Sequence, residues 1–114
     1  ILTNTTSGNR DNLVSEIKKE EGGLSGEPIQ QISTNMIKKF YKQLNGKIPI
    51  VGVGGVNSGK SAYEKIIAGA SLIQLYTGFI YRGPSVAKDI KKELIQILKV
   101  EGVKNIEDAV GRGV

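Results

Sequence analysis

The sequence predicts an α/β fold in which parallel strands alternate with helices. Two nearly continuous apolar runs, residues 48–53 and 70–76, have the length and composition of strands buried on both faces, as the strands of a parallel sheet are. Each run is followed by a segment whose apolar residues recur at helical spacing, and another such segment precedes the first run. Because strands and helices alternate along the chain, we expect right-handed crossover connections.

The N-terminal residues 1–26 show little regular pattern. Ile1 and Leu2 resemble the end of a strand, and the short polar side chains of residues 3–6 suit a flat polar ligand or, alternatively, a turn that closes on its own backbone. A polar loop is expected over residues 7–26, with at most one helical turn at 14–19. Near its end, glycines surround Ser25, which permits close backbone approach to a ligand; a hinge without a ligand is the alternative.

Three helices are predicted, and each ends at a glycine. The first follows Pro28 and has the apolar stripe Ile29, Ile32, Met36, Ile37, Phe40, Tyr41 and Leu44 before Gly46. The second covers residues 59–68 before Gly69. The third has Pro84 in its first turn and the stripe Val86, Ile90, Leu94, Ile97 and Leu98 before Gly102, and a short amphipathic piece is expected at 106–110.

Gly54 and Gly55 form a turn between the first apolar run and the second helix. Neither residue has a side chain that would keep a ligand from the backbone, and the helix that follows is expected to present free N–H groups at its start. Such a turn suits an anion, most often a phosphate.

The same stretch also matches the phosphate-loop pattern of nucleotide hydrolases, in which glycine, four residues and glycine precede Lys60 and Ser61. That pattern predicts ATP or GTP binding. However, the later apolar run ends in Gln74, Leu75 and Tyr76 rather than in an aspartate that would hold magnesium. A phosphate-loop hydrolase and a non-catalytic module that binds a phosphate ligand therefore stand as alternatives.

The composition excludes several kinds of site. The 114 residues include no cysteine and no histidine, so disulfides, thiolate metal sites and an imidazole base are excluded, and no metal site is expected. The formal charge is +5, but the lysines alternate with acids along helical segments, which indicates solvated faces rather than a nucleic-acid surface. No apolar run reaches the roughly 18 residues of a membrane span, and a signal-peptide layout is missing at the start. Since Ile1 rather than methionine comes first, we expect a piece of a longer polypeptide.

The polar and glycine-rich segments have a common position in this scheme. Residues 3–6, 22–26, 53–55 and 75–77 lie at or beyond the carboxyl ends of strands, or in the loop between them. In a (β/α)8 barrel that face carries the active site, and the last two strands commonly form a phosphate site. The spacing alone does not name the ligand.

Several motifs in order resemble the C-terminal part of dihydroorotate dehydrogenase, in its quinone-linked, membrane-associated class. They are Asn4-Thr5-Thr6, Gly22-Gly23-Leu24-Ser25-Gly26 with Pro28, residues 48–56 with Ser58-Gly59, residues 68–77, and Gly83-Pro84. The resemblance spans nearly the whole chain. It implies a (β/α)8 TIM barrel that binds flavin mononucleotide (FMN), of which residues 1–114 supply the end of strand six, helix six and strand–helix units seven and eight, within a single domain.

The resemblance also implies roles for individual residues. Contacts to FMN would fall on Thr3, Ser25, Gly26, Val53, Gly54, Gly55, Leu75, Tyr76 and Thr77, with the phosphate gripped by Gly54, Gly55, Tyr76 and Thr77. Asn4 and Thr5 would hydrogen-bond the pyrimidine ring of dihydroorotate or orotate. The quinone tunnel would meet the barrel near Tyr76, Phe79, Ile80 and Pro84.

The implied activity is the oxidation of dihydroorotate to orotate in pyrimidine synthesis, with FMN as hydride acceptor and a quinone as final electron acceptor. The family's catalytic serine base and its N-terminal membrane-associated helices match nothing in these residues. The chain is therefore expected to need the preceding part of the same protein and to be inactive alone. That part is also expected to associate the protein peripherally with the bacterial inner membrane or the mitochondrial inner membrane. An incomplete barrel is expected to leave inward-facing strand residues uncovered.

Overall fold

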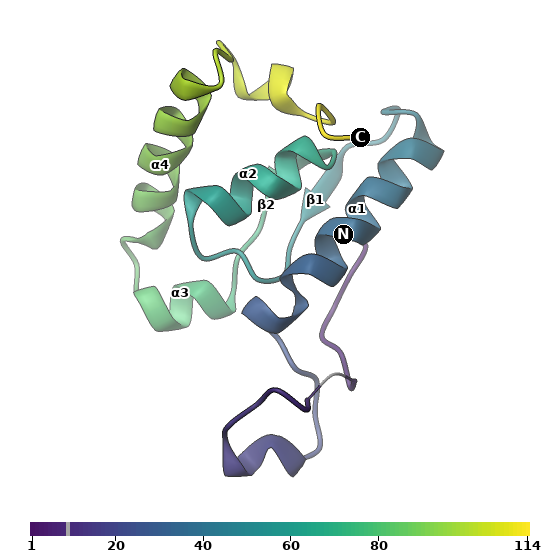
Figure 1. The fold of residues 1–114 in the computed structure, drawn as a ribbon, viewed down its shortest axis with the longest axis vertical. Coiled ribbons are helices and arrows are strands. Elements are labelled where there is room, and N and C mark those ends of the chain that lie inside the picture. The colour runs from purple at the N-terminus through teal and green to yellow at the C-terminus, as the bar shows by residue number, and fades with distance from the viewer. Residues whose placement is uncertain (9) are drawn as a thin grey trace.

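Two short parallel strands lie at the centre of the computed structural model, which describes residues 1–8 and 10–114 (Figure 1). Asn9, inside the predicted loop 7–26, lies outside the described residues. The elements in order are a 3₁₀ turn at Glu16–Lys19, another at Glu27–Ile29, α1 (Gln30–Leu44), β1 (Ile50–Gly52), α2 (Gly59–Ile67), β2 (Ala70–Ile73), α3 (Thr77–Arg82), α4 (Val86–Val100) and a 3₁₀ turn at Ile106–Ala109. Helix α2 lies in front of the strands in Figure 1, between α1 and α4. The α/β class and the strand–helix–strand crossover are thus confirmed.

The strands β1 and β2 are shorter than the apolar runs predicted. Ile50 pairs with Ala70 and Gly52 with Ile73, and one further hydrogen bond, from the Gln74 N–H to the Gly52 carbonyl oxygen at 2.9 Å, follows the ladder. The ladder stops there because the chain turns at Gly54, whose φ of 103° is incompatible with an extended strand. Residues 74–76 continue past β2 without a partner strand among the described residues.

The strand end expected at Ile1 and Leu2 is not formed within the described residues, because no strand pairs with them there: Ile1 is 69 % exposed, and Leu2 packs against the hydrophobic cluster around Ile37. Burial on both sheet faces is not met within this chain, since Leu72 of β2 is 62 % exposed, which agrees with the expectation that some strand residues stay uncovered. Within the described residues the helices cover one face of the pair, and the other face is open.

The core consists of three clusters of apolar side chains between the sheet and the helices. One gathers around Ile37 and Ile50, a second around Ala62 and Val86, and a third around Ile66. Ile73 of β2 packs against all three, so this strand ties the α1 side of the molecule to the α4 side. Burial of these apolar surfaces provides the main stabilisation of the fold.

The three predicted helices are confirmed, with adjusted ends. Helix α1 stops at Leu44 because Asn45 takes a left-handed conformation with φ of 50°, one residue before the predicted glycine. Helix α4 begins at Val86, so Pro84 lies in the preceding turn rather than in the first helical turn. Helix α3 was not predicted. None of the described helices has the length and apolarity needed to cross a bilayer.

Candidate functional site

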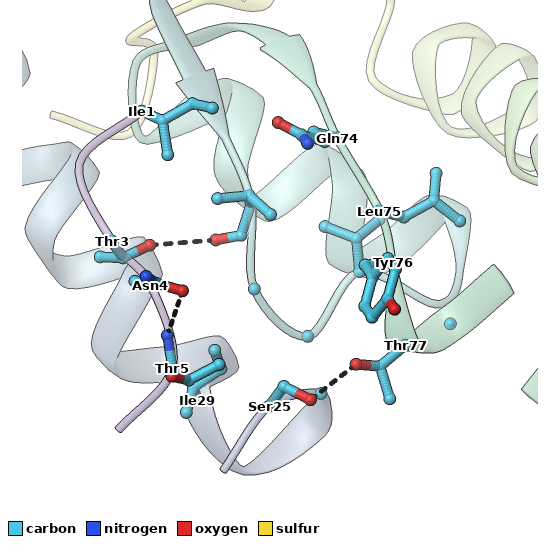
Figure 2. A pocket seen from close by; sticks show the side chains of 16 residues that line it. Ile1, Thr3, Asn4, Thr5, Ser25, Ile29, Gln74, Leu75, Tyr76 and Thr77 are labelled. Carbon is cyan, nitrogen blue, oxygen red and sulfur yellow. Dashed lines mark hydrogen bonds between the residues drawn. The ribbon is translucent and has the colours of Figure 1, made fainter. Parts of the chain in front are cut away.

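A cavity of about 350 Å³ opens at the carboxyl ends of β1 and β2 (Figure 2). It brings together every residue to which the family resemblance gave a flavin or pyrimidine contact, whereas Phe79, Ile80 and Pro84 of the expected quinone tunnel do not line it. The residues brought together are Thr3, Asn4, Thr5, Ser25, Gly26, Val53, Gly54, Gly55, Leu75, Tyr76 and Thr77. The remaining lining residues were not predicted from the sequence: Ile1, Ile29, Val56, Gln74 and Gly78. The cavity size falls in the range of roughly 300–1,000 Å³ that small-molecule and cofactor sites occupy.

Residues 1–6 form one wall of the cavity. Thr3 Oγ1 donates to the Val53 carbonyl oxygen at 3.4 Å, and an antiparallel bridge joins Thr6 to Leu24 through two backbone hydrogen bonds of 3.0 and 2.7 Å. The bridge places the glycine-rich end of the long loop beside this wall. Asn4 Oδ1 accepts from the Thr5 N–H at 2.9 Å, so part of the alternative reading, a turn closed on its own backbone, is realised here.

The glycine turn forms the floor of the cavity. Gly54 and Gly55 have φ of 103° and 73°, values that residues with a side chain rarely adopt. A Cβ on Gly55 would lie 2.4 Å from Gln30 Cβ, so the turn is pressed against the first turn of α1. Among the described residues, no protein acceptor takes the N–H of Gly54 or Gly55, which leaves both donors for a ligand.

Residues 74–77 and the start of α3 form the opposite wall (Figure 2). Ser25 Oγ and Thr77 Oγ1 lie 2.9 Å apart and share a hydrogen bond that ties the glycine-rich loop to this wall. Gly78 packs so closely that a Cβ would lie 2.3 Å from the Val56 carbonyl oxygen. This close approach explains why residue 78 is a glycine, but because it depends on a tertiary contact, no sequence pattern predicts it.

The start of α2 does not serve as an anion site, contrary to the expectation from sequence. Ser58 caps the helix, its Oγ accepting from the Ser61 N–H at 3.2 Å, and Ser61 Oγ in turn accepts from the N–H groups of Asn57 and Ser58 at 3.0 Å. The Gly59 N–H donates to the Glu93 carboxylate. Because these donors are engaged and Lys60 is exposed, the geometry of a phosphate loop is not formed.

A buried lysine lies behind the glycine turn. Lys65 of α2 is fully buried, and its Nζ donates to the Gln30 carbonyl oxygen at 3.3 Å, to Ser33 Oγ at 3.1 Å and to Thr34 Oγ1 at 3.0 Å. Ser33 Oγ in turn donates to the Val53 carbonyl oxygen. Burial lowers the pKa of Lys65 from 10.5 to about 8, while the neighbouring Glu64 carboxylate acts in the opposite direction.

Known proteins are similar to this chain in both sequence and fold. The family model for dihydroorotate dehydrogenase matches residues 1–98. The mitochondrial dihydroorotate dehydrogenase (quinone) of Arabidopsis thaliana is 48 % identical over 112 residues, which are 97 % of this chain and 24 % of the plant protein. The dihydroorotate dehydrogenase (quinone) of Natronomonas pharaonis is 49 % identical over 111 residues, 97 % of this chain and 31 % of the archaeal protein.

The solved structures agree. The crystal structure of ligand-free DHODH from Eimeria tenella superposes with a TM-score of 0.94 at 46 % identity, covering 98 % of this chain and 31 % of that one. The chain thus spans between a quarter and a third of the length of these relatives. Since the family model covers most of its residues, the chain belongs to the dihydroorotate dehydrogenase family.

Proposed function

We propose that this chain is the C-terminal part of an FMN-dependent dihydroorotate dehydrogenase of the quinone-linked class, which oxidises dihydroorotate to orotate in pyrimidine synthesis. One observation carries the proposal: the residues to which the family motifs give ligand contacts, spread from Thr3 to Thr77, line a single cavity. The quinone named in the relatives' descriptions supports the choice of class.

The rest of the catalytic domain, with the serine base, comes in this proposal from residues that precede the chain. The chain would then supply the end of strand six, helix six and the last two strand–helix units of one (β/α)8 barrel. The open face of the sheet supports this, because Leu72 and Ile1 are 62 % and 69 % exposed and require a cover that further barrel strands would provide. Alone, the chain would be inactive.

The cavity suits FMN in size and in donor chemistry. The N–H groups of Gly54 and Gly55, with Tyr76 and Thr77 opposite, would bind the phosphate, while Thr3, Ser25, Gly26, Val53 and Leu75 would contact the remainder of the cofactor. When bound, FMN supplies the acceptor for the hydride that leaves the substrate. The protein residues hold the reactants in place and exclude water from the site.

Asn4 and Thr5 would hold the substrate. Both side chains line the cavity and are exposed, and because Asn4 Oδ1 already accepts from the Thr5 N–H, the Asn4 amide is fixed with its NH2 group as the donor for a pyrimidine carbonyl oxygen. Fixing the flat ring in this way orients the carbon that loses hydride, which is where positioning contributes most to rate.

The quinone would approach along α3. Tyr76, Phe79 and Ile80 are 73 %, 49 % and 63 % exposed, an apolar surface next to the cavity that suits a lipid-soluble acceptor. Pro84 lies just beyond this helix. Peripheral association with the mitochondrial or bacterial inner membrane would come from the region that precedes the chain.

The proposal is tested on the full-length enzyme that carries this chain. Asn4→Ala should weaken orotate binding about tenfold, the loss expected for one hydrogen bond of roughly 1.4 kcal/mol, and leave the flavin content unchanged. Asn35→Ala, at an exposed position on α1 outside the cavity, is the matched control. Equal orotate affinity in the two variants would refute the substrate role of Asn4.

A second variant tests the phosphate site. Gly54→Val should expel the flavin, because φ is 103° there and a Cβ would already lie 3.1 Å from Ser33 Cβ. Flavin retained at full occupancy would refute the phosphate assignment. Magnesium-dependent nucleotide binding that is lost in Lys60→Ala would instead support the hydrolase alternative, and flavin binding without dihydroorotate oxidation in the complete protein would support a binding module.

A further inference from the structure

A buried cation, Lys65, lies behind the proposed phosphate site and has no acidic hydrogen-bond partner within residues 1–8 and 10–114. The three hydrogen bonds of Lys65 Nζ go to one carbonyl oxygen and two hydroxyl groups, and these match the three N–H donors of an ammonium group. Burying an ammonium group in this way costs free energy unless the charge takes part in a further favourable interaction. The Glu64 carboxylate next to it accepts instead from Gln30 Nε2 at 2.8 Å.

Two of the three partners of Lys65, Gln30 and Ser33, also pack against the glycine turn. A Cβ on Gly54 would meet Ser33 Cβ at 3.1 Å, and one on Gly55 would meet Gln30 Cα at 2.7 Å. Lys65 therefore fixes the segment of α1 on which both glycines rest, from the side opposite the cavity.

The hydrogen bonds also set the direction of the donors along this path. Ser33 Oγ accepts from Lys65 and so turns its own proton to the Val53 carbonyl oxygen. Thr3 Oγ1 lies 3.3 Å from Ser33 Oγ and 3.4 Å from the Val53 oxygen, and donates toward this pair. As a result, Ser33 and Thr3 hold the carbonyl oxygen that precedes Gly54, while among the described residues no acceptor takes the N–H groups of the turn.

We propose that Lys65 is a positioning residue of the phosphate site, whose buried positive charge, acting through Ser33, holds the turn at Gly54 and Gly55 in its anion-binding form and favours a phosphorylated flavin over an unphosphorylated one. The inference rests on the proposed function, because it takes the ligand of the turn to be the FMN phosphate. Lys65 itself touches neither flavin nor substrate.

The test compares two ligands that differ only in the phosphate group. Apoprotein of the full-length enzyme is titrated with FMN and with riboflavin, and binding is followed by quenching of flavin fluorescence. Lys65→Met keeps the length of the side chain and removes the charge, and it should raise the Kd for FMN about tenfold or more while changing the Kd for riboflavin less than about twofold. Lys60→Met, at an exposed position on the same helix, is the control and should leave both constants unchanged.

Ser33→Ala keeps the charge and breaks the link to Val53. It should reduce the preference for FMN over riboflavin by a smaller factor, about threefold. If Lys65→Met does not fold, this variant decides: a reduced preference supports the proposal, and an unchanged preference overturns it.

The outcomes separate this inference from the function on which it rests. A wild-type apoprotein that binds neither flavin refutes the proposed function, and the inference with it. A wild-type protein that prefers FMN, together with a Lys65→Met variant that has the same preference or loses both ligands equally, refutes the role of Lys65 alone.

Discussion

Gly55 and Gly83 allow backbone strain and steric clash to be separated in one experiment. Their φ values, 73° and 77°, are nearly the same, so alanine meets an unfavourable positive φ at both positions. The surroundings differ, however. A Cβ on Gly55 would lie 2.4 Å from Gln30 Cβ and 2.7 Å from its Cα, whereas nothing lies within 4 Å of a Cβ on Gly83.

The expected costs follow from these contacts. A positive φ of this kind costs a residue with a Cβ roughly 1–3 kcal/mol, and at Gly83→Ala this strain is the whole effect. At Gly55→Ala the clash is with helix backbone, which cannot rotate away, so overpacking adds roughly 1–3 kcal/mol. The turn must also move into the cavity, and FMN affinity should fall together with the free energy of unfolding.

Both variants are measured in the full-length enzyme by urea unfolding of the apoprotein and by FMN titration. We expect Gly83→Ala to lose about 1–3 kcal/mol of unfolding free energy with FMN affinity unchanged, and Gly55→Ala to lose about 2–6 kcal/mol with markedly weaker FMN binding. Equal losses of unfolding free energy in the two variants would show that α1 does not support the turn as described.

Three further predictions concern other contacts. The native pKa of Lys65, about 8, lies below the value of 10.5 in the unfolded chain, so between these pH values the unfolded chain binds more protons. The free energy of unfolding should therefore rise with pH, by about 3 kcal/mol in total, in the wild type but not in Lys65→Met. Urea titrations from about pH 7 to 10.5 measure this change. Glu93→Ala removes the acceptor of the Gly59 N–H and should cost about 1.5–3 kcal/mol of unfolding free energy, also measured with urea. Arg10→Lys loses a guanidinium that donates to three backbone carbonyl groups of the loop, and trypsin should then cut residues 10–22 faster.

Two of these predictions have a matched control variant, and the third has an outcome that would contradict it. Lys60→Met should follow the wild-type pH dependence, because Lys60 is exposed. Glu101→Ala, at the exposed end of α4, should change stability by less than about 0.5 kcal/mol. Trypsin cleavage at an unchanged rate in Arg10→Lys would mean that the arginine does not hold the loop.

The sequence was most informative where one local signal sufficed. Apolar runs located β1 and β2, and the stripes of α1 and α4 were read correctly because each helix covers about four turns. Helix α3 has six residues, among them a glycine and several β-branched or aromatic side chains, so neither periodicity nor propensity identifies it. Tertiary contacts hold it in place: Arg82 donates to the Asn57 carbonyl oxygen, and Gly78 packs on Val56.

The candidate site shows the same division. Family motifs pointed to the cavity residues, but the role of Lys65 was not visible in the sequence, since lysines in a helical segment normally face solvent. Its burial depends on α1 lying across α2, which is a feature of the three-dimensional fold. The opposite error occurred at the start of α2, where the phosphate-loop pattern predicted free N–H donors but the N–H groups of Ser58, Gly59 and Ser61 are engaged.

That capped start of α2 bears on how function is assigned from short patterns. Ser58 and Ser61 occupy positions at which a nucleotide-binding loop would need open donors, and the two side chains close the loop upon itself. A sequence pattern records only residue types. Counting which N–H groups still lack an acceptor distinguishes a ligand-binding loop from an ordinary helix cap. A lysine at position 60 is therefore not sufficient for a nucleotide site, because the hydrogen bonds made by Ser58 and Ser61 would also have to be given up.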